Sequence, residues 1–358
     1  MVPSMEDTVF LNEQSSVAFQ NTQPSQEIGK ISTNPQIPLP KIVTEINTLD
    51  DLISVAENIS NYPHMPPENK RRLQQVLPAL CKLKNLIGLA KIKDQIVNQV
   101  IFYIQKLNDG KNDMMHTCIE GDPGCGKTTL AKILGEIYCS LGILSTAKFH
   151  IAKRSDLVAG YLGQTAIKTQ KVLEEARGGV LFIDEAYSLG NQEEKDFFSK
   201  ECIDTINRFL TENKDDFVCI IAGYRDSLKN CFFSVNPGLE RRFPWRYAID
   251  PYSPEELLQI FMFQVKLNGY VLEDNGTSST NKTITAEFFR ENQTLFKNSG
   301  GDTESFLTKC KILHSNRVFF LPRRHRKILN AKDIANALKV FKSTTSNRDA
   351  DNHHALYL

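Results

Sequence analysis

The chain has 358 residues, a length that suggests two or three domains of ordinary size. Its hydrophobic fraction of 41% and charged fraction of 24% are typical of a globular protein and exclude a chain that is disordered throughout. The formal net charge is +1, so overall charge favours neither a nucleic-acid-binding nor a membrane-binding protein.

Targeting and metal-binding patterns are also lacking in the sequence. No apolar run reaches about 18 residues, and the first residues do not combine a cationic segment with an apolar one, so neither a membrane span nor a secretory signal is predicted. The 8 Cys form no C-x-x-C pair, which argues against a disulfide or zinc framework. We therefore expect a cytoplasmic protein that makes no membrane contact.

The N-terminal part of the chain divides into an arm and a helical extension. Residues 1–45 are rich in Pro, Ser, Asn, Thr and Gln, a composition that predicts a disordered arm. An amphipathic pattern over 48–59, with Thr48 as its cap, predicts a helix. Pro66 and Pro67 then open a second helical pattern, so 46–82 is expected to form a helical N-terminal extension.

From Leu83 onward, patterns typical of strands and of helices alternate. Strands are predicted at 114–120, 148–154, 179–186, 216–224 and 246–250, and helices at 127–140, 164–176 and 193–212. Alternation of this kind predicts an α/β domain over 83–250, with a parallel sheet covered by helices. After Pro251 strand patterns largely cease and helical patterns follow, which predict a small α-helical lid domain over 251–343 and a flexible tail over 344–358.

The strongest chemical signal is a glycine-rich phosphate-binding motif. Residues 121–128 read GDPGCGKT and fit G-x-x-x-x-G-K-[ST]. Glycines let the backbone N–H groups surround phosphate, and the N-terminus of the following helix adds positive potential. Lys127 is expected to reach the β- and γ-phosphates, and the Thr128 hydroxyl to hold Mg²⁺. The expected nucleotide-binding residues of this loop are Asp122, Pro123, Gly124, Cys125, Gly126, Lys127, Thr128 and Thr129.

A pair of acidic residues follows a buried strand. Leu181-Phe182-Ile183 precedes Asp184 and Glu185, which places both carboxylates at the carboxyl end of that strand. Asp184 is expected to hold Mg²⁺, directly or through water. Glu185 is expected to polarise the water that attacks the γ-phosphate, which favours nucleotide hydrolysis over nucleotide binding alone.

These two motifs occur in one order with the segments 153–166 (KRSDLVAGYLGQTA) and 236–243 (NPGLERRF), and together they resemble an AAA+ ATPase. The resemblance covers about 83–341 and is closest to the group that contains the Rubisco activase CbbX and the sporulation protein SpoVK, with homologues in giant DNA viruses. It implies a P-loop domain with a five-stranded parallel sheet of order 5-1-4-3-2, followed by a helical lid. It also implies a ring, usually a hexamer, with ATP at the subunit boundaries; for a viral protein the host cytoplasm would be the location.

The resemblance assigns further roles. Arg242, with Arg241 as the alternative, would be the arginine finger that reaches the γ-phosphate of the neighbouring subunit; otherwise the two are solvated side chains. The segment Gly160-Tyr161-Leu162-Gly163 resembles a pore loop, in which Tyr161 would grip an extended polypeptide, although a Tyr packed in an ordinary turn is the simpler alternative.

The chain also departs from the family pattern. Tyr224 occupies the position where AAA+ proteins usually carry a polar sensor residue, often Asn. Either its hydroxyl takes the place of that sensor, or its ring only packs against its neighbours. The lid segment Gly300-Gly301-Asp302 lacks the second sensor Arg, which leaves the coupling between lid and hydrolysis open. Ile87-Gly88-Leu89 resembles the family's entry segment, whose apolar side chains pack against adenine, but an ordinary core contact is a comparable alternative.

Three functions are compatible with these features, all with ATP and Mg²⁺ as cofactors. The favoured one is an ATP-driven ring that remodels a protein client held by Tyr161. A nucleic-acid-associated motor or clamp-loader-like ATPase is the alternative suggested by the basic run at 323–327. A nucleotide-controlled scaffold with little turnover is the third, suggested by the missing second sensor. The client itself, Rubisco included, does not follow from the sequence.

Overall fold

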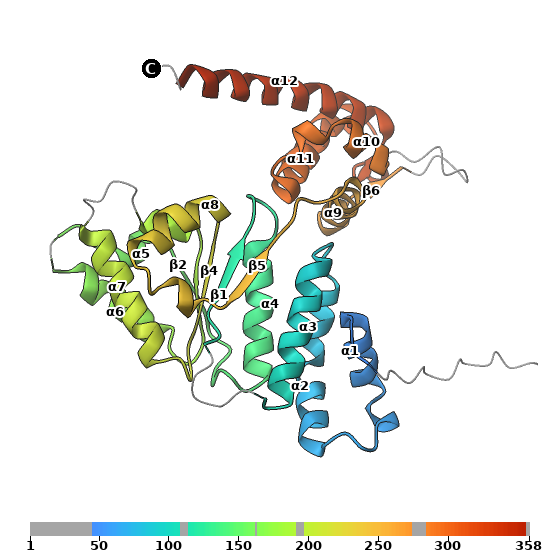
Figure 1. Ribbon diagram of the computed structural model, residues 1–358. Coiled ribbons are helices and arrows are strands. Elements are labelled where there is room, and N and C mark those ends of the chain that lie inside the picture. The colour runs from blue at the N-terminus through green and yellow to red at the C-terminus, as the bar shows by residue number, and fades with distance from the viewer. Residues whose placement is uncertain (1–44, 108–113, 162, 191–196, 274–283, 356–358) are drawn as a thin grey trace, which may run out of the picture. The chain divides into compact units, whose positions relative to one another are not determined.

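A computed structural model describes the backbone of residues 45–107, 114–161, 163–190, 197–273 and 284–355, and the side chains of these ranges as far as residue 344. The expected arm lies outside the described residues except for Glu45. The centre of the fold is a five-stranded sheet of order β2-β3-β4-β1-β5 in which all neighbouring strands are parallel (Figure 1). The predicted fold class and strand order are therefore confirmed.

The five strands are shorter than the sequence patterns predicted. They span Thr117–Glu120 (β1), Phe149–Ala152 (β2), Val180–Ile183 (β3), Val218–Gly223 (β4) and Trp245–Ala248 (β5). The register aligns their carboxyl ends, because Glu120 pairs with Gly223 and Ile183 pairs with Ile221. Residues that follow β1, β3 and β4 consequently meet at one edge of the sheet.

One face of the sheet is covered by the N-terminal helices together with α4. These are Leu49–Glu57 (α1), Pro67–Lys84 (α2), Ala90–Ile104 (α3) and Lys127–Ser140 (α4). They share one core with sheet residues such as Ile119, Phe182 and Ile220. Thr48 caps α1 as predicted, since its side chain accepts a hydrogen bond from the Asp51 N–H in a capping box. The helix α3 was not predicted.

A buried polar chain ties this layer to the sheet. The Tyr247 hydroxyl on β5 donates to Gln99 Oε1 on α3 at 2.6 Å, and Gln99 Nε2 lies 3.4 Å from the Tyr138 hydroxyl on α4. That hydroxyl is in turn 3.1 Å from Thr117 Oγ1 on β1. Each polar group in this chain has a partner, which fixes the N-terminal helices on the domain that carries the phosphate loop.

The opposite face of the sheet is covered by Arg154–Leu157 (α5), Thr165–Glu175 (α6) and Phe197–Glu212 (α7). The side chains of Cys118, Leu181 and Ile221, which alternate with those of the first face, join this second core. Short helical turns connect β4 to β5, namely Arg225–Ser227 (α8), Leu228–Phe232 (η3), Phe233–Val235 (η4) and Glu240–Arg242 (η5). Both faces of the sheet are thus buried, in agreement with the near-continuous apolar strands.

The lid has a core of its own. Its helices are Pro254–Leu267 (α9), Ala286–Glu291 (α10), Ser299–Val318 (α11) and Ala331–Ala355 (α12), and aromatic residues such as Phe261, Phe289 and Phe306 fill the space between them. The lid also contains one short pair of strands, which the sequence did not predict. Val271–Leu272 (β6) pairs in parallel with Ile328–Leu329 (β7). Helix α12 extends through Ala355, into the range expected to be a flexible tail.

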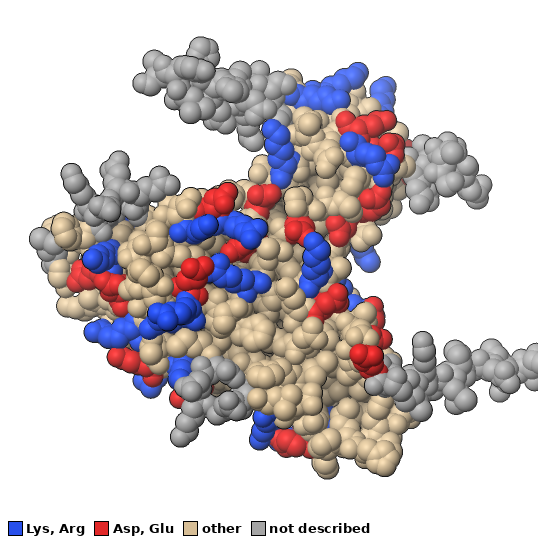
Figure 2. Space-filling view, viewed as in Figure 1, with Lys and Arg blue, Asp and Glu red and all other residues tan. Residues whose placement is uncertain are grey.

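Charges of both signs are interspersed on the face shown in Figure 2. Among the described residues, no helix is both long enough and apolar enough to cross a bilayer.

Candidate functional site

The phosphate loop joins β1 to α4. Gly124 and Gly126 have φ angles of 69° and 93°, in the left-handed region that residues with a Cβ rarely occupy. Gly126 lies directly before Lys127, where α4 begins as predicted. The sequence therefore needs glycine at these two positions so that the chain can turn from the strand into the helix with its N–H groups facing inward.

Lys127 reaches back over this loop. Its ammonium group donates hydrogen bonds to the carbonyl oxygens of Gly121 at 3.0 Å and Asp122 at 2.7 Å. It also lies 5.8 Å from the centre of the Tyr224 ring, within the range of a cation–π contact. Its positive charge is therefore held at the mouth of the loop.

The two predicted carboxylates follow β3. The backbone N–H of Glu185 donates to Asp184 Oδ1 at 3.1 Å. Glu185 has φ 51° and ψ 45°, a left-handed conformation that costs a residue with a Cβ about 1–2 kcal/mol. Backbone strain of this kind is characteristic of functional positions. In the described part of the chain, neither carboxylate forms a salt bridge.

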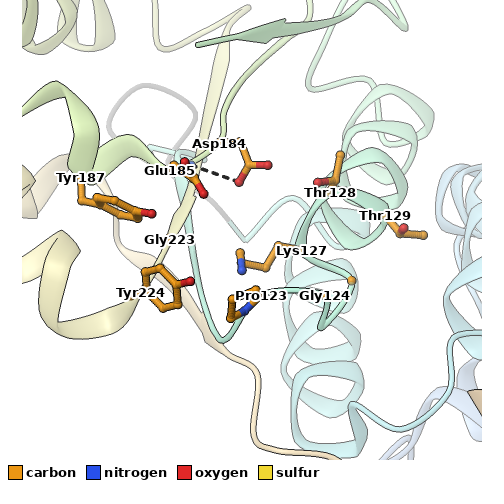
Figure 3. Close-up of a pocket in the computed structure, with 11 residues that line it drawn as sticks. Pro123, Gly124, Lys127, Thr128, Thr129, Asp184, Glu185, Tyr187, Gly223 and Tyr224 are labelled. Atoms are coloured by element: carbon orange, nitrogen blue, oxygen red, sulfur yellow. Dashed lines mark hydrogen bonds between the residues drawn. The ribbon is translucent and has the colours of Figure 1, made fainter. Parts of the chain in front are cut away.

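These groups line one pocket of about 350 Å³ (Figure 3). Thr128 on α4 and Asp184 face each other across it, and Lys127 lies between the loop and the acidic pair. The pocket is lined by Pro123, Gly124, Gly126, Lys127, Thr128, Thr129, Asp184, Glu185, Tyr187, Gly223 and Tyr224. Of the expected loop residues, Asp122 contributes its carbonyl to Lys127, and Cys125 is buried beneath the loop.

Two phenols complete the wall opposite α4. The rings of Tyr187 and Tyr224 lie 5.6 Å apart, and their hydroxyls point into the pocket (Figure 3). Burial and the nearby Glu185 carboxylate raise the pKa of Tyr187 to about 12 and also raise the pKa of Tyr224. Both hydroxyls therefore keep their protons at neutral pH and remain hydrogen-bond donors. Tyr187 and Gly223 were not predicted.

The chemistry of this pocket fits a nucleotide phosphate chain with its magnesium. Glycine-lined backbone and one ammonium group suit phosphate, and the oxygens of Thr128 and Asp184 are the hard ligands that Mg²⁺ prefers. Among the described residues, no group of three or more His, Cys, Asp or Glu could hold a metal. A magnesium ion here would thus take most of its ligands from phosphate and water, as Mg²⁺ commonly does.

A second pocket of about 220 Å³ lies beside the N-terminus of α3. It is lined by Leu89, Ala90, Lys91, Ile92, Ala248, Asp250, Pro251, Tyr252 and Glu256. Of the segment expected to contact the base, Leu89 is part of this lining, whereas Ile87 and Gly88 are not. A Cβ on Gly88 would lie 2.5 Å from Glu256 Oε1, so that glycine allows a close approach to the lid.

The lid touches the phosphate loop directly. A Cβ on Gly124 would lie 2.5 Å from the backbone nitrogen of Gly301 and 2.6 Å from the carbonyl oxygen of Asn298, at the start of α11. The Tyr252 hydroxyl, just before α9, donates to the Cys125 carbonyl at 2.9 Å. Backbone-to-backbone contact thus connects the lid to the loop at the place where the expected second sensor Arg is missing.

Residues 117–250 match the family described as ATPase family associated with various cellular activities (AAA). The chain is 38% identical over 322 residues to "Putative cfxQ-like protein R730" of Acanthamoeba polyphaga mimivirus, covering 88% of this chain and 77% of the relative. It is 35% identical over 229 residues to "Stage V sporulation protein K" of Bacillus subtilis, covering 58% and 70%. It is also 32% identical over 257 residues to "Ribulose bisphosphate carboxylase/oxygenase activase, chloroplastic" of Cyanidioschyzon merolae, covering 70% and 85%.

The chain belongs to the AAA+ ATPases, within their CbbX/SpoVK-like group. The resemblance inferred from the motifs is confirmed, including the giant-virus homologue. As a member of this family the protein binds nucleotide and is an ATP hydrolase.

In this AAA+ ATPase the two candidate arginine fingers lie in the turn η5, away from the pocket of their own chain. The guanidinium of Arg242 donates to the Gly238 carbonyl at 2.7 Å and to Thr211 Oγ1 at 3.3 Å, whereas Arg241 is exposed. Neither lines the pocket. This placement agrees with a role toward another subunit but does not choose between the two residues.

Charged side chains join η5 to the strand that ends in the phosphate loop. Arg246 on β5 pairs with Glu240 at 2.9 Å and with Glu120 at 3.6 Å. Glu120 is the last residue of β1, is only 8% exposed and also pairs with Arg225 at 3.5 Å. The ion pairs therefore connect the base of the phosphate loop to the turn that carries the candidate fingers.

The predicted pore-loop residue Tyr161 is 74% exposed. A Cβ added to either flanking glycine, Gly160 or Gly163, would meet no atom within 4 Å, so the segment is open on both sides of the ring. Leu162 lies outside the described residues. The alternative, a Tyr packed in an ordinary turn, does not fit this exposure within one subunit.

Replacing Gly124 with Ala tests the contact between lid and loop. The added Cβ would overlap Gly301 and Asn298, so we expect faster hydrogen exchange at the backbone amides that begin α11. Gly142→Ala is the matched control, because Gly142 has a similar φ of 75° but no atom within 4 Å of the added Cβ. Both variants should lose about 1–2 kcal/mol through backbone strain. Equal exchange of the α11 amides in the two variants would contradict the contact.

Proposed function

We propose that this AAA+ ATPase hydrolyses ATP·Mg²⁺ within a ring of identical subunits and uses the energy to remodel a protein client gripped by Tyr161. One observation carries the proposal. Lys127, Thr128, Asp184 and Glu185 converge on one pocket, while an aromatic side chain stands exposed between two glycines on a separate segment. The first set supports hydrolysis, and the exposed ring supports contact with another molecule.

Each polar group of the pocket has a distinct task in this proposal. The phosphate chain would be held by the N–H groups of the loop and by Lys127, and magnesium by Thr128 and Asp184, where it would neutralise charge on the phosphates. Glu185 has no cation partner among the described residues, so its carboxylate is available to orient and polarise a water molecule. Tyr224 would donate its hydroxyl toward the phosphates in the place of the usual polar sensor.

The remodelling role rests on the nature of the exposed ring. Tyr offers a large and rigid contact surface that tolerates many sequences, and its flanking glycines allow the segment to move. One of the similar proteins is named as the activase of an enzyme. A protein client is therefore favoured over a small molecule.

Glu185→Gln tests hydrolysis. The amide keeps the shape of the side chain but cannot accept the proton of the attacking water, so turnover should fall at least 100-fold. ATP binding, measured by calorimetry, should change by less than about threefold, because the amide leaves the phosphate loop intact. Phosphate release that is equally low in wild type and variant would instead favour the nucleotide-controlled scaffold. Held in ATP, the variant should also retain a bound client in a pull-down.

Mixed rings test the arginine finger. Arg242→Ala should lose at least 100-fold in turnover and keep ATP binding, because a trans-acting cation stabilises the transition state on the neighbouring subunit. Mixing Arg242→Ala with Lys127→Ala subunits should restore activity above either variant alone, since intact sites then meet intact fingers. The double variant Lys127→Ala/Arg242→Ala serves as the mixing control. If activity is restored on mixing with Lys127→Ala subunits only when Arg241→Ala replaces Arg242→Ala, the arginine finger is Arg241. If neither mixture restores activity, neither arginine of this turn is the finger.

Tyr161→Ala tests the client contact. The side chain is exposed and lies far from the phosphate loop in sequence, so basal ATP hydrolysis should stay within about twofold of wild type. Release or unfolding of a trapped client should be lost. Tyr161→Phe keeps the ring and should retain most of the remodelling activity. Unchanged client processing by Tyr161→Ala would remove this residue from the mechanism.

A further inference from the structure

The lid carries a concentration of positive charge that the overall composition hides. Residues 305–332 contain 8 Lys and Arg and no Asp or Glu, in a chain whose net charge is +1. Four of these cations fall within five consecutive residues, at Arg323, Arg324, Arg326 and Lys327. Like charges placed so close together repel one another, so an anionic partner would stabilise this segment.

Most of this charge is not neutralised within the lid. Arg317 pairs with Asp333 at 2.8 Å, and His314 lies 2.9 Å from the same carboxylate, so this inner group is structural. By contrast, Arg323, Arg324, Arg326 and Lys327 are all exposed. None of these four forms a salt bridge with the residues that the structure describes.

Two aromatic rings stand beside the basic run. Phe319 and Phe320 follow the end of α11 and are 73% and 91% exposed. Their ring centres lie 4.8 Å apart at an interplanar angle of 84°, so the edge of one ring packs against one face of the other. The remaining faces are open to stack with a flat partner. Tight turns at 318–321 and 322–326 keep the rings next to the cations.

Neighbouring elements extend this surface. The ammonium of Lys311 on α11 donates to Asn268 Oδ1 at 3.1 Å, and the ammonium of Lys327 donates to the carbonyl of the same Asn268 at 3.4 Å. Lys327 also lies 4.1 Å from the centre of the Tyr270 ring. Cations from α11 and from the segment after it therefore gather at the C-terminal end of α9, which lies beside α11 in Figure 1.

We propose that the segment 319–327 is a binding surface for single-stranded nucleic acid. A closely spaced row of cations beside open aromatic rings is the combination that binds single strands, since cations contact the phosphates and bases stack on the rings. An acidic peptide would meet the charges but would leave the rings without flat partners. A membrane surface is a weaker candidate for the partner. The two Phe side chains together offer about as much hydrocarbon as one acyl chain, and a single acyl chain binds a protein to a membrane only marginally.

The test is fluorescence anisotropy with the full-length protein and a labelled single-stranded oligothymidylate of about 20 nucleotides. Binding should weaken about 50-fold between 50 and 200 mM salt, as expected for about four phosphate contacts. Phe319→Ala/Phe320→Ala should weaken binding at least tenfold without changing the salt dependence. Arg323→Glu/Arg324→Glu should weaken it further and flatten the salt dependence. Duplex DNA of the same length should bind more weakly because its bases are stacked internally.

Lys148→Glu/Lys171→Glu is the matched control, because it makes the same change of charge at two exposed positions outside the lid. It should bind the oligonucleotide nearly as well as wild type, and all variants should keep the wild-type melting temperature and ATP hydrolysis. Failure of wild type to bind at 50 mM salt, or equal binding by the Phe variant, overturns the proposal. So does equal affinity for polyglutamate, which would indicate charge attraction alone, or tighter binding to phosphatidylserine vesicles, which would indicate a membrane surface.

Discussion

The alignment of strand ends at one edge of the parallel sheet is the constraint on which the site depends. β1 leads into the phosphate loop and β3 into the acidic pair, yet the two strands are not neighbours, since β4 lies between them. The Gly121 N–H donates to the Gly223 carbonyl at 3.1 Å, which fixes the loop against the end of β4. Because β4 also pairs in register with β3, the oxygens of Asp184 and Thr128 come to face each other.

Backbone strain gathers around the same edge. Four non-glycine residues in the described chain have a positive φ; two of them line the two pockets, and a third lies at the lid helix that contacts the phosphate loop. Glu185 holds the carboxylate proposed to act on water, Leu89 lines the second pocket, and Ser299 begins the lid helix that touches Gly124. Each such conformation is costly, so it persists only where the surrounding packing enforces it. The concentration at these pockets is itself an argument that they are functional.

The sequence predicted those parts of the fold that have local signals. The phosphate loop, the start of α4 at Lys127 and the strand before Asp184 all follow from short patterns of glycine and apolar residues. Helix α3 escaped prediction because its N-cap is Leu89, which provides no side-chain cap, although its apolar positions recur with helical spacing. The pair β6 and β7 was missed because each strand has 2 residues and the partners are far apart in sequence. Tyr187 was missed because only the tertiary fold places it against Gly223.

The lid offers a way to sense nucleotide without a second sensor Arg. An Arg would act through charge at the γ-phosphate, whereas here the lid contacts the loop through the backbones of Gly124, Gly301 and Asn298 and through Tyr252. The space between Gly124 and the start of α11 is too small for a Cβ, so the two backbones pack closely. If phosphate binding displaces the loop backbone, this steric contact is the route by which the displacement would reach the lid. Such coupling depends on distance rather than charge, and it should therefore change little with ionic strength.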